Sequence, residues 1–214
     1  MPLRYSCFIS YRHGQGQIDI VKELVESLKT ELSLWLELEE LGVFLDEGRL
    51  KGGEFFNEKL ARALCESVCL IVVFTPTYFS EWSTFCAREY KAMERLEKKR
   101  LPYLSKHRNE KGLIIPIVYR GDKDLPDSIR KKRQYYTVES FHISGRGNSD
   151  NPEYAKIIKE IGEYIRERCD DLRVVEDIIC EPCDTFDFPE EDEISDWLKT
   201  MLPPKPSFPG RKTV

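Results

Sequence analysis

The sequence contains no hydrophobic run of the length that a membrane helix requires. Its longest apolar stretches, CLIVVF at residues 69–74 and GLIIPIVY at residues 112–119, have the length of strands. A membrane-spanning helix needs roughly 20 apolar residues. The first residues, MPLRYSCFISYRH, also lack the apolar core of a secretory signal. We therefore expect a cytoplasmic protein without a membrane partner.

Residue sets that mark several common ligand sites are also missing. Gly14 and Gly16 follow the first apolar run, but the third glycine of the dinucleotide-binding pattern G-x-G-x-x-G is absent. Cys180 and Cys183 form a lone C-x-x-C, whereas a zinc site would need a second pair of ligands. Lysine and arginine are not gathered into a stripe with aromatic residues. We expect no resident cofactor, no bound metal and no nucleic-acid partner.

The composition is that of a soluble globular protein. Hydrophobic residues make up 41% of the 214 residues and charged residues 33%, and a core of this size needs neither a disulfide nor a metal. The seven cysteines are an odd number. Cys65, Cys69 and Cys86 lie in apolar or helical segments, where a reduced thiol packs as a small hydrophobic group. We expect these three thiols to be reduced.

The charge and the prolines divide the chain into two parts. Residues 170–214 hold 12 acidic and 5 basic residues, together with six of the twelve prolines, while the formal net charge of the whole chain is −5. We expect residues 1–169 to form the folded domain and residues 170–214 to be an acidic, proline-rich extension. Such an extension cannot bury enough apolar surface to fold alone, but it could dock on the domain through Phe186, Phe188 and Trp197.

Strand and helix patterns alternate along the domain. Apolar runs typical of strands occupy residues 5–10, 42–46, 69–74, 112–119 and 134–139, and helical spacing occupies residues 18–41, 54–67, 85–99 and 151–169. Continuously apolar strands separated by helices predict a doubly wound α/β fold, with a parallel sheet covered on both faces. Ligands in such folds bind beyond the carboxyl ends of the strands. The loops at residues 10–17, 46–53, 75–85 and 119–124 are therefore the places to look for a site.

Four motifs resemble a known family in order and spacing. They are FISYR at 8–12, GVFLDEGRLKGGEF at 42–55, ALCESVCLIVVFTPTYF at 63–79 and FCAREY at 85–90. Together they resemble the Toll/interleukin receptor (TIR) domain, and more closely its NAD-cleaving branch, over roughly residues 4–169. The resemblance implies a flavodoxin-like three-layer sandwich with a five-stranded parallel sheet. It also implies an NAD⁺ glycohydrolase or ADP-ribosyl cyclase, with NAD as substrate, that is activated by TIR–TIR self-association. A bacterial TIR protein of this kind would act in antiphage immune defence, with an effector or sensor protein as a further partner.

The resemblance makes Glu89 the catalytic residue. TIR enzymes carry W-x-x-x-E or W-C-x-x-E, and Cys86 and Glu89 match the last part of the second pattern. Phe85 stands where the tryptophan would be and Trp82 lies three residues earlier, so either ring could line the pocket. Nicotinamide leaves as a neutral molecule, and an ionised carboxylate can stabilise the cationic ribose that remains. The alternative is that Glu89 is a solvated acid on the face of a helix.

The resemblance also assigns substrate-binding residues. It places Ser10 on the pocket floor and Arg12 toward the phosphates or the adenine side of NAD, although Arg12 could instead form a loop salt bridge. Asp46 belongs to the loop that borders the substrate and mediates TIR–TIR packing, and Phe55 is an aromatic residue of the same region that could equally be core. His13 is a further loop residue that could touch the ligand.

Two other functions stay open on the sequence alone. One is a non-catalytic TIR adaptor that signals only by self-association. The other is an enzyme like the nucleoside 2-deoxyribosyltransferases, in which a carboxylate attacks the glycosidic carbon of a nucleoside. For an NAD-cleaving enzyme, the sequence does not choose between water, adenine or an outside nucleophile as the acceptor, and these would give ADP-ribose, a cyclic isomer or a conjugate.

Overall fold

The computed structural model describes residues 3–14, 17–36, 41–45, 55–104, 112–143, 151–175 and 183–202. Its centre is a five-stranded sheet in the order β2-β1-β3-β4-β5, in which every neighbouring pair is parallel. The strands are β1 (Tyr5–Tyr11), β2 (Gly42–Leu45), β3 (Ser67–Phe74), β4 (Ile114–Val118) and β5 (Tyr136–Thr137). The predicted doubly wound α/β fold with a five-stranded parallel sheet is confirmed.

The burial of the central strands explains their sequences. β3 and β4 are buried at every position, and β1 is buried from Ser6 onward. Strands covered on both faces have no solvent side, so they read as continuous apolar runs and do not alternate. The last strand was expected at residues 134–139 but contains only Tyr136 and Thr137, because it lies at the edge of the sheet and pairs only with β4.

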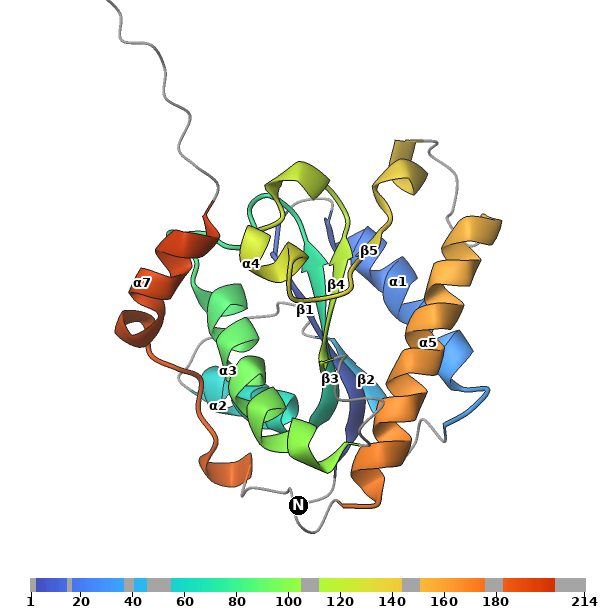
Figure 1. Cartoon of the computed structure of the whole chain (residues 1–214), viewed down its shortest axis with the longest axis horizontal. Coiled ribbons are helices and arrows are strands. Elements are labelled where there is room, and N and C mark those ends of the chain that lie inside the picture. Colours follow the sequence, from blue (N-terminus) through green and yellow to red (C-terminus); the bar gives the residue numbers. More distant parts are fainter. Residues whose placement is uncertain are drawn as a thin grey trace, which may run out of the picture.

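Helices cover both faces of the sheet. They are α1 (Gln17–Leu32), α2 (Phe55–Cys65), α3 (Phe85–Arg100), the short α4 (Asp127–Arg130), α5 (Pro152–Arg173) and α7 (Glu191–Met201). Figure 1 shows α1 and α5 on one face and α2 and α3 on the other, with α7 outside α3. This is the predicted three-layer sandwich. Within the described residues, no helix is both long enough and apolar enough to cross a membrane.

The first helix is shorter than its apolar pattern suggested. The sequence predicted a helix over residues 18–41, but α1 ends at Leu32 and turns follow at residues 33–36. The Ser33 hydroxyl donates to the Thr30 carbonyl at 2.7 Å, and Leu34 beyond it is 69% exposed. For residues 33–36 the helical prediction was wrong, because the chain leaves the helix in turns there and both Leu34 and Trp35 are exposed. Residues 37–40 of the predicted helix lie outside the described residues.

Helix α5 has a well-capped N-terminus. The Asn151 side chain accepts hydrogen bonds from the backbone amides of Glu153 and Tyr154, and Pro152 occupies the first turn. Its buried face packs against α1. The helix extends to Arg173, so the domain boundary expected after residue 169 falls inside it.

The C-terminal segment of residues 183–202 docks on the outer side of α3, through the aromatic residues that the sequence offered for docking. The Trp197 ring stacks on Tyr90 with centroids 5.7 Å apart and meets Phe79 edge-on at the same distance. Phe188 is 5% exposed, and Phe186 packs partly buried against the core. We call this segment the C-terminal strap.

Polar contacts from three residues of the α3 region fasten the strap as well. Thr84 Oγ1 donates to Glu191 at 2.6 Å, and Arg88 Nε donates to the Pro189 carbonyl at 2.7 Å. Further along the helix, an Arg95 nitrogen lies 2.5 Å from a Glu193 carboxylate oxygen. The strap therefore contacts α3 along much of its length and reaches the turn just before Glu89.

A disulfide between Cys65 and Cys183 joins the strap to the end of α2. The expectation of a reduced Cys65 was wrong, because the fold brings its Cα to 5.6 Å from that of Cys183, a distance that a disulfide can bridge. Cys180 lies outside the described residues. Cys69 and Cys86 are buried free thiols, as predicted.

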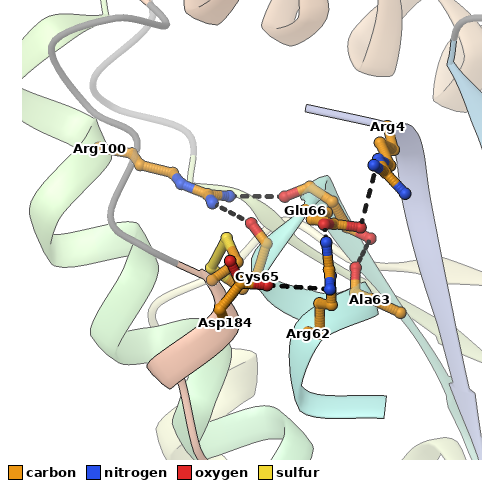
Figure 2. Close-up of a disulfide and its surroundings, with 9 residues drawn as sticks. Arg4, Arg62, Ala63, Cys65, Glu66, Arg100 and Asp184 are labelled. Atoms are coloured by element: carbon orange, nitrogen blue, oxygen red, sulfur yellow. Dashed lines mark hydrogen bonds and ion pairs between the residues drawn. A yellow bond between two sulfur atoms is a disulfide. The ribbon is translucent and has the colours of Figure 1, made fainter. Parts of the chain in front are cut away.

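Charged residues hold the backbone around this disulfide. Arg100 donates to the carbonyl of Cys65 at 2.5 Å (Figure 2). It also donates to the carbonyl of Ser67 at 2.5 Å. Arg62 lies 2.9 Å from both Glu66 and Asp184, so it links the end of α2 to the strap (Figure 2). These charged side chains thus hold the backbone at Cys65 and at Asp184, the residue next to Cys183.

Candidate functional site

The strand order reverses between β1 and β3. These two strands lie side by side, and the helices that follow them, α1 and α3, cover opposite faces of the sheet (Figure 1). In an open α/β sheet, ligands bind in the crevice that such a reversal leaves beyond the carboxyl ends of the strands. Ser10 lies near this end of β1, and Glu89 lies in the helix that follows β3. Both predicted site residues are therefore at the position that the topology favours for a ligand.

Glu89 is a buried carboxylate held by a hydroxyl from another element. Its exposed fraction is 7%, and that of Ser10 is 1%. Ser10 Oγ donates a hydrogen bond to Glu89 Oε2 at 2.5 Å, although 79 residues separate the two along the chain. An ionised carboxylate accepts hydrogen bonds only, and burying it is costly unless donors compensate it. Glu89 is thus not the solvated helix acid of the alternative interpretation.

Tyr78 extends this contact into the core. It follows β3, is fully buried, and places its hydroxyl oxygen 2.6 Å from Ser10 Oγ. Sequence reasoning missed this residue, although the loop at residues 75–85 was singled out as a place to look. Its position in that loop was the available signal, but the contact with Ser10 depends on how β1 and β3 pair.

Cys86 lies one helical turn before Glu89 and is 4% exposed. Burial raises the pKa of the Cys86 thiol well above its ordinary value, and the nearby Glu89 raises it further. A cysteine acts as a nucleophile through its thiolate. Cys86 is therefore suited to packing and not to covalent catalysis.

Arg12 directly follows β1 and is half-buried. Its positive charge opposes the rise in the pKa of Cys86, so its guanidinium lies within electrostatic range of this turn of α3. His13, the next residue, is exposed and stacks on Tyr11 with ring centroids 4.5 Å apart. The expected role of Arg12 toward the phosphates of NAD stays a prediction.

A second buried acid in α3 provides a contrast with Glu89. Glu97 receives two hydrogen bonds of 2.8 Å from the Arg133 guanidinium and one of 2.5 Å from the Leu113 amide. This cationic partner and the backbone donor identify Glu97 as a structural acid that ties α3 to the start of β4. Glu89 instead meets the hydroxyl of Ser10 at the opposite end of the sheet, where ligands bind in this type of fold.

A family comparison agrees with this geometry. The family model described as the TIR domain matches residues 7–156, which include Ser10, Tyr78 and Glu89. The chain belongs to the TIR domain family. This family includes both NAD-cleaving enzymes and non-catalytic adaptors, and TIR domains commonly self-associate. The C-terminal strap lies beyond the matched residues.

The two aromatic candidates of the TIR domain differ in exposure. Trp82 is 94% exposed and lies in the loop before α3, whereas Phe85, the first residue of α3, is 39% exposed. The Arg88 guanidinium lies 6.0 Å from the Phe85 ring and 5.8 Å from the ring of Phe188 in the strap. Phe85 thus lies one turn before Glu89, next to the strap. The assignment of either ring to the pocket stays a prediction.

Two predicted substrate-binding residues cannot be placed relative to the others. Asp46 lies outside the described residues of this TIR domain. The backbone of Phe55 begins α2, but its side chain also lies outside the description. Their expected roles beside the substrate and in TIR–TIR packing therefore stay predictions.

A cavity at the other end of the TIR domain is a less suitable site. It has a volume of about 210 Å³ and lies at the amino ends of β4 and β5, with Arg133 and Tyr164 in its lining. Arg133 is bound to Glu97, and the Tyr164 hydroxyl donates to the Gly112 carbonyl. These polar groups are engaged within the protein, so the reversal point around Glu89 remains the better candidate.

Proposed function

We propose that the protein is an NAD⁺ nucleosidase that cleaves the bond between nicotinamide and ribose. The observation that carries the proposal is the buried carboxylate of Glu89, which a Ser10 hydrogen bond of 2.5 Å orients at the point where the strand order reverses. Membership of the TIR domain family supports the choice of NAD as substrate, because part of that family cleaves it.

The chemistry requires one carboxylate and no general acid. Nicotinamide departs as a neutral molecule from a cationic ring, and the ribose carbon becomes an oxocarbenium-like centre. An ionised Glu89, hydrogen-bonded to the ribose hydroxyls, would stabilise this positive charge and would not need to reorient during the reaction. Removing one such preorganised group typically costs about 3–4 kcal/mol of transition-state stabilisation. Arg12 would contact the phosphates, since a guanidinium can bind them through two hydrogen bonds.

The acceptor and the biological role form the finer part of the proposal. Water as acceptor gives ADP-ribose, the adenine of the same molecule gives a cyclic isomer, and an outside nucleophile gives a conjugate. We place the activity in antiphage immune defence and expect TIR–TIR assembly to switch it on, on the strength of the family alone. The strap is a candidate gate, because it contacts α3 at Thr84 and Arg88, on either side of Phe85.

The test is an NAD consumption assay with product identification by mass spectrometry. Wild-type protein is used at high concentration or with a crowding agent, so that assembly is favoured, and is compared with Glu89→Ala. Glu94→Ala is the matched control, because Glu94 lies on the same helix in a half-buried pair with Lys91. We expect nicotinamide release by the wild type and the control but not by Glu89→Ala.

Other outcomes of this experiment separate the alternatives. Self-association without NAD loss in any assembled sample would favour the adaptor. Cleavage of nucleosides with a covalent adduct on Glu89 would favour the enzyme class of the nucleoside 2-deoxyribosyltransferases. Unchanged activity and oligomeric state after deletion of residues 170–214 would remove the strap as a gate.

A further inference from the structure

The position of the Tyr78 hydroxyl is fixed by core packing. The side chain is fully buried, with its ring edge-on to Phe79 at 4.8 Å and tilted against Phe74 at 6.3 Å. Its backbone amide donates to the Thr75 carbonyl at 2.9 Å in the turn that follows β3. The ring therefore cannot move away from Ser10 without disturbing this aromatic cluster.

Counting protons determines which atom donates in each hydrogen bond. Ser10 and Tyr78 carry one hydroxyl proton each, and an ionised Glu89 has none to give. Ser10 therefore donates to Glu89 at 2.5 Å, and Tyr78 must donate to Ser10 at 2.6 Å. Among the described residues, the Cys86 carbonyl also lies near the Tyr78 hydroxyl, but at 3.5 Å it is too far to compete well.

We propose that Tyr78 is a positioning residue that acts through Ser10 to orient Glu89 and to stabilise its ionised form. This inference rests on the proposed NAD cleavage, and it adds a residue that does not itself contact the substrate. Donation by Tyr78 polarises the Ser10 hydroxyl, and linked hydrogen bonds of this kind strengthen one another. It also prevents the Ser10 hydroxyl from rotating away from the carboxylate.

Within the part of the protein that the structure describes, the other titratable groups around this hydrogen-bond chain stay in one state over the working pH range. Burial raises the pKa of Tyr78 and of Cys86 well above their ordinary values, and burial raises that of Tyr90 to about 12. Arg12 supplies a positive charge within electrostatic range of this turn of α3. Glu89 is therefore the group among them that takes up a proton as the pH falls.

The sign of the expected pH effect follows from this arrangement. Without the Tyr78 hydroxyl, the Ser10 donor is weaker and the ionised Glu89 is less stabilised. Glu89 then binds its proton at a higher pH, so the acid limb of the activity profile moves upward. Loss of one neutral hydrogen bond predicts a shift of the acid limb by roughly half a pH unit, equivalent to about a three-fold change. Poorer orientation of the ionised Glu89 should also lower kcat on the plateau above that limb by about three-fold.

A double-mutant cycle tests whether Tyr78 acts through Ser10. Tyr78→Phe removes only the hydroxyl and keeps the packed ring, and Ser10→Ala removes the intermediate link. We expect Tyr78→Phe to lower kcat and shift the acid limb in the wild-type background, but to have no further effect in Ser10→Ala. Equal effects of Tyr78→Phe in both backgrounds, or none in the wild type, would overturn the proposal.

A matched control and a second readout separate this inference from the proposed function. Tyr154 is a similarly buried tyrosine in α5, where its side chain is hydrogen-bonded to Ser27 of α1 and not to the residues around Glu89. Tyr154→Phe removes its hydroxyl and should leave the pH profile unchanged. If the wild type does not cleave NAD, the proposed function fails, and the hydrogen-bond chain is judged by NMR titration of the Glu89 carboxyl carbon. Its midpoint should move to higher pH in Tyr78→Phe, and an unmoved midpoint would refute the role of Tyr78.

Discussion

The disulfide between Cys65 and Cys183 should make a large contribution to the stability of the protein. The two cysteines are 118 residues apart in the sequence, so the bridge closes a loop that includes most of the domain. The chain-entropy model assigns a loop of this length about 5 kcal/mol at 25 °C, and loss of native disulfides typically costs roughly 2–5 kcal/mol. Residual structure in the unfolded chain lowers the effect, so we expect Cys183→Ser to reduce the free energy of unfolding by about 3 kcal/mol.

Urea unfolding with and without a reductant measures this effect. Reductant should destabilise the wild type by about the same amount as the substitution and should leave Cys183→Ser unchanged, which makes that variant its own control. Titration of thiols in the denatured, unreduced wild type should give two fewer groups than after reduction. Equal thiol numbers, or equal stability of the wild type and Cys183→Ser without reductant, would refute the reasoning.

Three further perturbations follow from the contacts of α3. Glu97→Gln should lower the free energy of unfolding by roughly 2 kcal/mol, because the largely buried Arg133 guanidinium loses its 2.8 Å carboxylate partner and keeps only the longer 3.8 Å ion pair with Glu94; stability equal to wild type in urea would contradict this. Trp197→Ala should weaken docking of the strap on Tyr90 by about 2 kcal/mol and speed amide exchange in α7, whereas unchanged exchange would show that this ring does not hold the strap. Burial raises the pKa of the Cys86 thiol, so iodoacetamide at about pH 8 should label Cys86 only after unfolding; rapid labelling of the native protein would show that the thiol is accessible.

The sheet and the acid of the candidate site could be predicted from the sequence for different reasons. Strands such as residues 69–74 are buried on both faces, and that environment leaves a continuous apolar run that is visible without a structure. Glu89 was identified by its spacing from Cys86 within a family motif. The structure adds its burial and its hydrogen bond to Ser10, which local spacing does not contain.

The features that sequence reasoning missed all depend on contacts between distant segments. Tyr78 meets Ser10 only because β1 and β3 pair in one register. The partner of Cys65 is set by the path of the strap, whereas the sequence presented Cys183 only as half of a lone C-x-x-C with Cys180. The apolar pattern also predicted a first helix that is too long. Helix α1 ends at Leu32, although apolar residues at helical spacing continue beyond it in the sequence.

The most direct test of the account is the rate of nicotinamide release from NAD by assembled wild-type protein and by Glu89→Gln. This substitution keeps the size of the side chain and removes its charge, and Glu94→Gln on the same helix is the control. The account predicts a loss of about 100-fold or more for Glu89→Gln and a rate close to wild type for the control. Equal rates for Glu89→Gln and the wild type would contradict the assignment of Glu89 as the catalytic carboxylate.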